Sequence, residues 1–229
     1  MIAIIDYGVG NLFSLRSSLN KIGADTVVTA DPAVISKADK LILPGVGAFA
    51  DAAKKLRDSG LDQVIKAEAA AGKPIMGICL GMQMLFEKSY EYGEHEGLGL
   101  LKGSVVPMEG SIPAGLKIPH IGWNALKFQG ESKLFKYIKE GDCVYFVHSF
   151  YASGCEDSLI ATAEYGKDLT AAVARDNVMG CQFHPEKSGD VGLNILRAFC
   201  EEEMKCSCYL PSIYLTKRPS GFTRATIRI

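Results

Sequence analysis

The chain lacks a strong excess of either charge and lacks a long apolar run. Its 229 residues carry 25 Lys and Arg against 26 Asp and Glu, which gives a formal net charge of −1. No basic stripe runs through the body of the chain, so neither nucleic acid nor an anionic membrane is expected as a partner. No apolar run approaches the length that spans a bilayer. The balance of residues instead favours a small substrate.

Targeting signals and paired cysteines are also missing. Residues 1–6 show no basic segment and no small-residue cleavage site but read directly as a buried strand, so a cytoplasmic protein is expected. The seven cysteines form an odd set without paired C-x-x-C spacing, which supports neither a disulfide framework nor a zinc site. We therefore predict reduced thiols, no metal site and no cofactor.

Apolar runs alternate with helical periodicity through the first half of the chain. We predict strands at 1–6, 27–28, 40–43 and 74–78 and helices near 11–22, 48–58, 61–71 and 82–88. This alternation predicts an α/β fold with a doubly wound, mostly parallel sheet flanked by helices. From about 98 to 150, hairpin-like strands separated by Gly and Pro predict an antiparallel addition to the same domain.

Cys79 has the surroundings of a nucleophile. Gly77 and Gly81 flank it two residues away on either side, as in a G-x-nucleophile-x-G turn between a strand and a helix. At the start of a helix, backbone N–H groups and the positive end of the helix dipole favour the reactive thiolate. The alternative interpretation is a buried structural cysteine, and this motif alone does not decide between the two.

His184 and Glu186 supply a base and a carboxylate. They follow an apolar run, and in an extended strand end two side chains spaced by two residues point to the same side. With Pro185 keeping the backbone out of a helix, the carboxylate can bind one imidazole nitrogen and leave the other for Cys79. An exposed His and a solvated Glu are the alternative. Taken together, the two motifs favour a Cys-His-Glu catalytic triad.

These motifs resemble those of the class-I, triad-type glutamine amidotransferases, which carry an elbow cysteine, a Gln four residues later and H-P-E near the C-terminus. Cys79, Gln83, His184 and Glu186 match that pattern. Further segments narrow the resemblance to the glutaminase subunits of imidazole glycerol phosphate synthases, which act in histidine biosynthesis; they are residues 6–12, 43–49, 119–124, 145–150 and 184–188. The resemblance covers residues 1–204 as one amidotransferase domain and implies a flavodoxin-like fold.

The resemblance implies a reaction and the residues around it. L-Glutamine would be hydrolysed to glutamate and ammonia through a thioester on Cys79. Backbone N–H groups of Val46, Gly47 and Leu80 would form the oxyanion hole, although residues 44–47 can also be an ordinary strand-to-helix turn. Many relatives carry consecutive glycines where this chain has Val46, so we expect low activity without a partner. The residues expected in the glutamine pocket are Gly45, Gln83, His148, Ser149 and Phe150.

The resemblance also implies a partner. In the family, a (β/α)8-barrel cyclase subunit forms a heterodimer with the glutaminase and receives ammonia through a sheltered channel. The barrel adds ammonia to a phosphoribulosyl formimino nucleotide and releases imidazole glycerol phosphate and aminoimidazole carboxamide ribotide. Asn11, Trp123, Tyr145 and Lys187 are the expected interface residues. For Trp123, the only tryptophan, a place in the core is the alternative.

Other interpretations stay open. The same chemistry can serve another ammonia acceptor, such as a synthase that forms amidines on surface sugars, and an amidotransferase shell can act as a non-catalytic regulatory subunit. His148 is a second candidate base, without a carboxylate two residues on. Residues 205–229 depart from the family pattern, with five Lys or Arg and no acid, and we predict a loosely ordered basic tail whose deletion leaves glutaminase activity intact.

Overall fold

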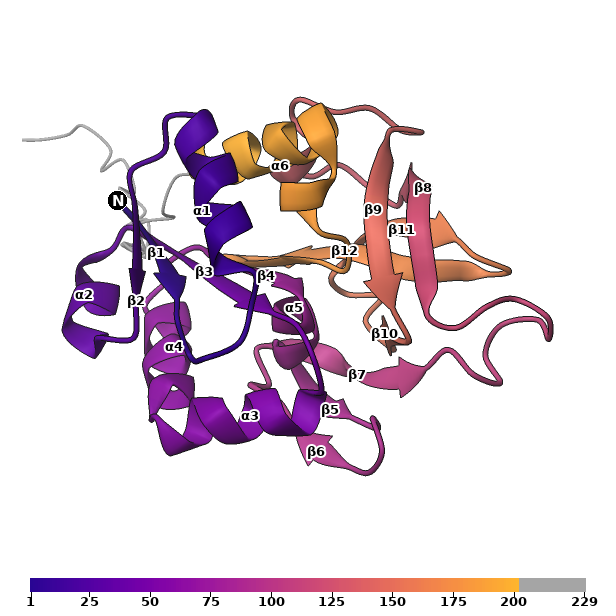
Figure 1. Cartoon of the computed structure of the whole chain (residues 1–229), viewed down its shortest axis with the longest axis horizontal. Coiled ribbons are helices and arrows are strands. Elements are labelled where there is room, and N and C mark those ends of the chain that lie inside the picture. The colour runs from indigo at the N-terminus through magenta and orange to yellow at the C-terminus, as the bar shows by residue number, and fades with distance from the viewer. Residues whose placement is uncertain (202–229) are drawn as a thin grey trace, which may run out of the picture.

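A computed structural model describes residues 1–201, so the predicted tail at 205–229 and the boundary at 204 lie outside the described part (Figure 1). A nine-stranded sheet forms the centre of the structure. In spatial order its strands are β2 (Thr26–Thr29), β1 (Ile2–Ile5), β3 (Lys40–Gly45), β4 (Ile75–Cys79), β13 (Val178–Cys181), β12 (Asp168–Arg175), β11 (Leu159–Glu164), β8 (His120–Phe128) and β9 (Cys143–His148).

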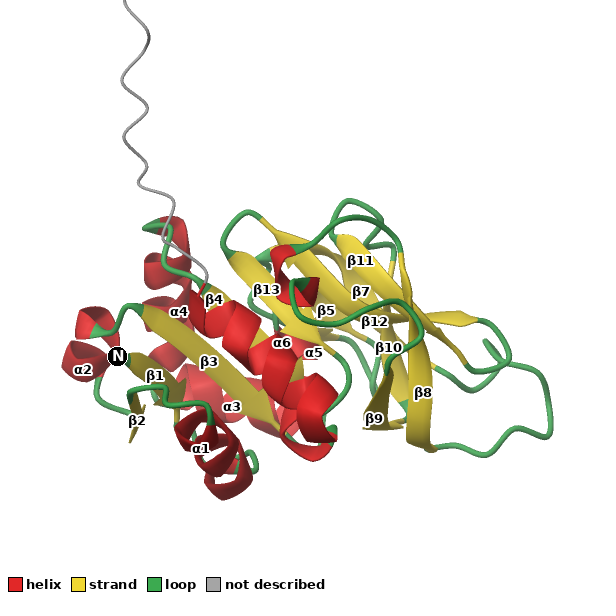
Figure 2. Ribbon diagram, turned by 90° about the horizontal axis from the view of Figure 1, so that it is seen from above, coloured by secondary structure: helices red, strands yellow, loops and turns green. Residues whose placement is uncertain are grey.

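The sheet has a parallel half and an antiparallel half. Strands β2, β1, β3, β4 and β13 run parallel to one another, whereas β12, β11, β8 and β9 each pair antiparallel with their neighbours. Figure 2 shows the helices gathered over the parallel half, while the antiparallel strands extend away from them. The predicted doubly wound, mostly parallel sheet is confirmed for the half that carries Cys79.

Helices cover both faces of the parallel half, because alternate residues of each buried strand point to opposite sides. Ile4 and Met76 pack under α1 (Leu12–Lys21) and α6 (Gly189–Glu201). Ile5 and Leu43 pack on the other face, which four helices cover: α2 (Pro32–Lys37), α3 (Phe49–Asp58), α4 (Leu61–Ala70) and α5 (Leu80–Met84). The two helical layers lie on opposite sides of the strands in Figure 1.

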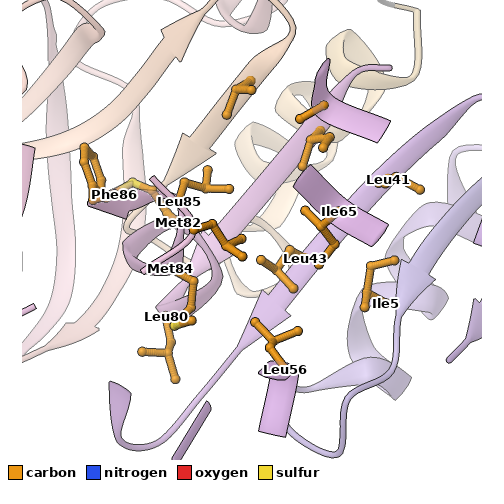
Figure 3. Packing of buried hydrophobic residues seen from close by; sticks show 14 of the residues in the cluster. Ile5, Leu41, Leu43, Leu56, Ile65, Leu80, Met82, Met84, Leu85 and Phe86 are labelled. Atoms are coloured by element: carbon orange, nitrogen blue, oxygen red, sulfur yellow. The ribbon is translucent and has the colours of Figure 1, made fainter. Parts of the chain in front are cut away.

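The short helix α5 is anchored deep in the second layer. Its five residues are all buried. Figure 3 shows Leu80, Met82 and Met84 among the side chains of Leu43 on β3 and Leu56 on α3. Truncating one such buried Leu or Met to Ala typically costs about 2–5 kcal/mol of stability, so the turn that precedes α5 is held firmly from one side.

A second, four-stranded sheet contains part of the predicted addition. Its order is β10 (Phe150–Ser153), β7 (Leu101–Pro107), β5 (Phe86–Ser89) and β6 (His95–Glu96). Strand β7 pairs antiparallel with β10, as β8 does with β9, so the predicted antiparallel addition is confirmed; its parallel pairing is with β5, which precedes that region. Two 3-10 turns, η1 (Lys133–Phe135) and η2 (Pro185–Lys187), complete the described elements.

Two predictions about local structure are wrong. The helix predicted over 82–88 ends at Met84, and β5 begins at Phe86, because the side chain of Phe86 is fully buried and its backbone pairs with Leu101. Burial and strand pairing override the helix propensity of the residues that follow. Helix α2 was missed, although Asp31 caps it and Pro32 occupies its first turn, as is typical of a helix start.

Within residues 1–201, no helix is both long enough and apolar enough to cross a bilayer.

Candidate active site

The nucleophile candidate lies on a strained turn. Cys79 is the last residue of β4 and the N-cap of α5, with a φ of 55° and a ψ of −113°. A positive φ is costly for a residue with a side chain, and such strain persists only where the surroundings hold it. Cys79 is only 7% exposed, so its thiol is largely shielded from solvent. The predicted strand-to-helix turn is therefore present, and we call residues 77–81 the nucleophile turn.

Glycines are required around Cys79 by space rather than by their own φ angles. A Cβ added to Gly81 would lie 1.8 Å from the carbonyl oxygen of Leu43, and one on Gly77 would lie 2.6 Å from the carbonyl oxygen of Gly81. A Cβ on Gly45 would lie 2.8 Å from the backbone nitrogen of Gly81. The end of β3, the end of β4 and the start of α5 thus approach at backbone distance, and no side chain fits between them.

His184 and Glu186 come together, but by a route that differs from the expected one. The Nδ1 atom of His184 lies 2.8 Å from Oε1 of Glu186, and both side chains are 3% exposed. The predicted extended segment is wrong, because Pro185 opens the 3-10 turn η2 instead of holding the backbone away from a helix. Proline's fixed φ suits the first position of a helical turn, and this tight turn brings the carboxylate back to the imidazole.

The imidazole of His184 is in an unusual electrostatic setting. Burial alone would lower its pKa, but hydrogen bonds to the side chains of Cys79 and Glu186, together with their electrostatic attraction for the imidazolium, raise the pKa of His184 to about 9. At neutral pH the ring therefore holds its proton beside the sulfur and the carboxylate. This arrangement can exchange a proton between a thiol and an imidazole without exposing either to bulk water.

His148, the second candidate base, is engaged elsewhere. Its Nδ1 lies 2.8 Å from the Phe150 carbonyl oxygen, and its Nε2 lies 3.2 Å from Nδ1 of His120. Burial lowers the pKa of His148 to about 4, and the neighbouring imidazoles act in the same direction. The ring therefore stays neutral, with its nitrogens facing Phe150 and His120. Of the two candidates, His184 is the one hydrogen-bonded to Cys79.

A cavity of about 380 Å³ opens beside the nucleophile turn, a size suited to a small metabolite. Most of the residues predicted for the oxyanion hole and the glutamine pocket line it, as do both reactive groups: Val46, Gly47, Cys79, Leu80, Gln83, His148, Ser149, Phe150 and His184. Gly45 does not line the cavity, since it packs against Gly81. Glu186 lies behind the imidazole of His184.

Gln83 is fixed at the wall of this cavity. Its Nε2 donates to the Phe150 carbonyl oxygen over 3.1 Å and to Oε1 of Gln182 over 3.0 Å. Both amide hydrogens are therefore committed to the protein, and the amide oxygen is the part of Gln83 left to accept hydrogen bonds. Gln182, a fully buried residue, was not among the predicted site residues.

Glu91 is a further cavity residue that sequence reasoning missed. It is 9% exposed, and its Oε2 accepts a hydrogen bond of 2.7 Å from the backbone N–H of Phe49. The carboxylate thus caps helix α3, whose own N-cap residue, Ala48, has no side-chain cap. Nothing in the sequence separates Glu91 from the other acids of its segment, because its place depends on the packing of the β5–β6 segment against α3.

The loop that follows β3 is open by comparison with the nucleophile turn. We call residues 46–48 the β3–α3 loop; it starts directly after Gly45, which is in register with Cys79. Val46 is 42% exposed, and Gly47 has a φ of 94° with no atom within 4 Å of an added Cβ. Just before the loop, the buried hydroxyl of Tyr7 donates to the Pro44 carbonyl oxygen over 2.8 Å.

Three of the four predicted interface residues lie together. The rings of Trp123 and Tyr145 have their centroids 4.8 Å apart, and Nζ of Lys187 lies 5.7 Å from the Tyr145 ring centroid. Trp123 is 62% exposed, so its predicted alternative as a core residue is wrong. Asn11 caps α1 by accepting a hydrogen bond from the Ser14 N–H, and α1 packs against η2, which contains Lys187.

Cysteines and metal-ligating groups are dispersed in the described residues. Cys79, Cys143, Cys155, Cys181 and Cys200 are free thiols, and Cys206 and Cys208 fall outside the described residues. Across residues 1–201, no three side chains of His, Cys, Asp or Glu are grouped in a way that could hold a metal ion.

Comparison with curated proteins gives close relatives over almost the whole chain. The chain is 51% identical over 207 residues to the imidazole glycerol phosphate synthase subunit HisH of Caldanaerobacter subterraneus subsp. tengcongensis, covering 90% of this chain and 100% of that protein. It is 54% identical over 202 residues to the protein of the same name from Sulfurimonas denitrificans, covering 87% of this chain and 97% of that protein.

Solved structures share the fold, and a family model identifies the wider group. A crystal structure described as that of a glutamine amidotransferase superposes with a TM-score of 0.68 at 19% identity, covering 87% of this chain and 99% of that one. The structure of PurLQS from Thermotoga maritima gives a TM-score of 0.66 at 22% identity, covering 86% and 96%. The family model for class-I glutamine amidotransferases matches residues 3–202. The resemblance inferred from the motifs is confirmed, and the chain belongs to the class-I glutamine amidotransferase family.

Proposed function

We propose that the chain is the glutaminase subunit of an imidazole glycerol phosphate synthase. It hydrolyses L-glutamine to glutamate and ammonia and passes the ammonia to a synthase subunit in histidine biosynthesis. The observation that carries the proposal is the buried contact of Cys79, His184 and Glu186 at one cavity, in a chain about half identical to proteins named as such subunits.

The first chemical step uses Cys79 and His184. The thiolate attacks the side-chain amide carbon of glutamine while the imidazolium of His184 keeps the proton that the thiol has lost. His184 then gives that proton to the departing nitrogen, and ammonia leaves a thioester on the sulfur. Glu186, bonded to Nδ1 over 2.8 Å, holds the ring in the orientation that presents Nε2 to the sulfur.

The second step returns the enzyme to its starting state. A water molecule attacks the thioester carbon, and His184 accepts a proton from that water as it attacks. The C–S bond breaks, glutamate is released, and the proton is shared again between sulfur and imidazole. Both steps pass through a tetrahedral oxyanion, which requires N–H donors close to Cys79.

The donors for the oxyanion come from the nucleophile turn and from the β3–α3 loop. Leu80 is the first residue of α5, where backbone N–H groups have no partner within the helix. The second donor is an N–H of Val46 or Gly47 in the β3–α3 loop, which lines the same cavity. Because this loop is exposed at Val46 and open around Gly47, contact with the partner orients the second donor.

The cavity offers complementary groups for the amino-acid end of glutamine. The buried carboxylate of Glu91 and the uncommitted amide oxygen of Gln83 accept hydrogen bonds from the α-ammonium group. The hydroxyl of Ser149 and nearby backbone N–H groups donate to the α-carboxylate. An amide that lacks the amino-acid end is therefore expected to bind poorly.

The partner is a (β/α)8-barrel cyclase subunit that binds beside the cavity mouth. Trp123, Tyr145 and Lys187 form an aromatic and basic cluster there, and Lys187 also lines the cavity. Exposed Trp is typical of the anchors that dominate binding energy at protein interfaces. A partner seated on this cluster receives ammonia without its release to solvent.

The test follows the amide nitrogen. Glutamine labelled with ¹⁵N at the amide is supplied to the chain, the barrel subunit and its formimino nucleotide, in a buffer that contains unlabelled ammonium. Label in imidazole glycerol phosphate is expected, and its loss with Cys79→Ala would show that this chain supplies it. Glutamate release with no labelled product would instead direct the search to another acceptor, such as an amidine-forming synthase.

A further inference from the structure

We infer that Gln182 is a positioning residue for the nucleophile, linking the wall of the glutamine pocket to the sulfur of Cys79. The inference rests on the proposed glutaminase function and adds a residue that none of the predicted site assignments includes. Gln182 is fully buried, directly after β13 and two residues before His184. Its Nε2 lies 3.8 Å from Sγ of Cys79, and its Oε1 accepts from Gln83 over 3.0 Å.

The orientation of this amide is set at its far end by a backbone carbonyl. The carbonyl oxygen of Phe150 is an acceptor only, so Nε2 of Gln83 must face it, at 3.1 Å. The second hydrogen of that nitrogen points at Gln182 and requires an oxygen there, which is Oε1. The other end of the Gln182 amide is therefore its N–H group, and this donor is the one turned toward Cys79.

A buried N–H donor beside the sulfur has a chemical consequence. A thiolate accepts hydrogen bonds far better than a thiol does, so a fixed donor favours the charged, attacking form. His184 supplies a positive charge to the same sulfur, while Gln182 supplies a neutral donor from the same segment of chain. The segment 182–186 thus provides a donor, a base and a carboxylate in order.

The backbone of Gln182 is held as firmly as its side chain. Its N–H donates to the Ala171 carbonyl oxygen over 2.8 Å, and the next residue, Phe183, is fully buried. The N–H of His184 donates to the Tyr145 carbonyl oxygen over 2.9 Å. With its backbone held between two strands, its side chain fully buried and its Oε1 bonded to Gln83, the amide of Gln182 is a fixed donor rather than a mobile one.

The test measures Cys79 itself. The rate at which iodoacetamide alkylates Cys79 is followed against pH by mass spectrometry of the peptide that carries it, so that the other cysteines do not interfere. In Gln182→Met, which keeps the volume and loses the donor, we expect about a tenfold slower reaction at neutral pH and a profile moved to higher pH, as for loss of one hydrogen bond to a charged group. Gln182→Glu, which places a negative charge beside the sulfur, should move the profile further.

A matched variant controls for the loss of an amide as such. The Gln129 amide donates to Thr162 Oγ1 over 3.1 Å at the far end of β8, and Gln129→Met should leave the alkylation profile unchanged. Gln182→Asn keeps the amide one methylene further from the sulfur and should fall between wild type and Gln182→Met. Thermal unfolding checks that each variant is folded.

The outcomes separate this inference from the proposed function. Alkylation does not consume glutamine, so a wild-type profile in a folded Gln182→Met or Gln182→Glu chain would overturn the role of Gln182 and leave the glutaminase assignment standing. With the partner present, we expect kcat to fall about tenfold in Gln182→Met. The opposite result is also informative. If the alkylation profile shifts in the Gln182 variants but the wild-type chain releases no glutamate with any partner, the proposed function would be wrong and the role of Gln182 as a donor would stand.

Discussion

The two sides of the proposed oxyanion site are built in opposite ways. The nucleophile turn is closed in by backbone, since an added Cβ on Gly81 or Gly77 would meet other atoms at 1.8 and 2.6 Å. The β3–α3 loop, which follows the residue in register with Cys79, leaves the space around Gly47 empty and exposes Val46. The packing thus holds the proposed nucleophile in place, whereas it leaves room around the loop proposed to supply the second oxyanion donor.

This difference assigns two tasks to two parts of the site: one part holds Cys79, and the other makes activity depend on the partner. The positive φ of Cys79 can persist only in rigid, well-packed surroundings. The packing of α5 between β3 and α3 provides them (Figure 3). In the proposed mechanism, activity depends on the partner because the partner orients the more open β3–α3 loop. We therefore predict that glutamine is hydrolysed slowly until the synthase partner is bound.

The largest effect is expected from removing the sulfur while leaving its packing intact. Cys79→Ala should lower glutamate release by several orders of magnitude, because no other group forms the thioester. Glutamine binding, measured by calorimetry, should persist, since the cavity residues around Gln83 and Glu91 are untouched. Substantial turnover in this variant would exclude the thioester mechanism.

The packing contrast itself is tested by a pair of glycine substitutions. Gly81→Ala should destabilise the chain by about 4 kcal/mol or more, because the methyl group cannot avoid the Leu43 carbonyl. Gly47→Ala meets no atom and should cost only about 1–2 kcal/mol for its positive φ. Denaturant unfolding measures both.

Gly60 provides the control for that pair, as it also has a positive φ and nothing within 4 Å of an added Cβ. Gly60→Ala should match Gly47→Ala in stability, yet leave glutaminase activity in the complex unchanged, whereas Gly47→Ala should reduce it. Equal stability losses for Gly81→Ala and Gly47→Ala would mean that the two sides are not packed differently.

Measuring stability against pH tests the positive charge on the imidazole of His184, next to the nucleophile turn. The pKa of His184 is raised to about 9 in the folded chain, from 6.5 when unperturbed, so its contribution to stability is full below pH 6.5 and is lost as pH rises through about 9. The unfolding free energy of wild type minus that of His184→Asn should therefore be largest near pH 6, by up to about 3 kcal/mol, and shrink toward pH 10. A difference that grows with pH would reverse the assigned direction.

The smallest effect is expected from a substitution in the β3–α3 loop. Val46→Gly gives the β3–α3 loop more freedom to present an N–H to the oxyanion, and we expect it to raise glutamate release by the free chain a few-fold, about 1 kcal/mol of transition-state stabilisation. Activity in the complex should change little, because the partner already orients the loop. A free-chain rate that falls instead would mean that Val46 supports the productive conformation.

Much of this site was predictable because its signals are local. The glycines around Cys79 and the H-P-E run at 184–186 marked the reactive groups, and strand alternation predicted the parallel half of the sheet. What failed depended on tertiary contacts. The strand β5 displaced a predicted helix because Phe86 is buried, and η2 replaced an extended segment while still bringing Glu186 to His184.

The residues that sequence analysis missed reach the site only through tertiary packing. Gln182 lies next to a matched motif, but its contact with Cys79 arises only when β13 and β4 pair side by side. Glu91 reaches the cavity because the segment between β5 and β6 packs at the start of α3, which no spacing in the sequence encodes. Conversely, Gly45 was predicted to touch the substrate and instead forms the close backbone contact behind the nucleophile.

The most direct test of the account is the rate of glutamate release from glutamine by the purified chain, alone and with the barrel subunit and its nucleotide ligand, in one assay. If Cys79 is held in place while the β3–α3 loop still has to be oriented, the chain alone should turn over slowly. The barrel subunit with its nucleotide bound should stimulate it strongly. A free chain that turns over glutamine as fast as the complex would contradict that division of the site.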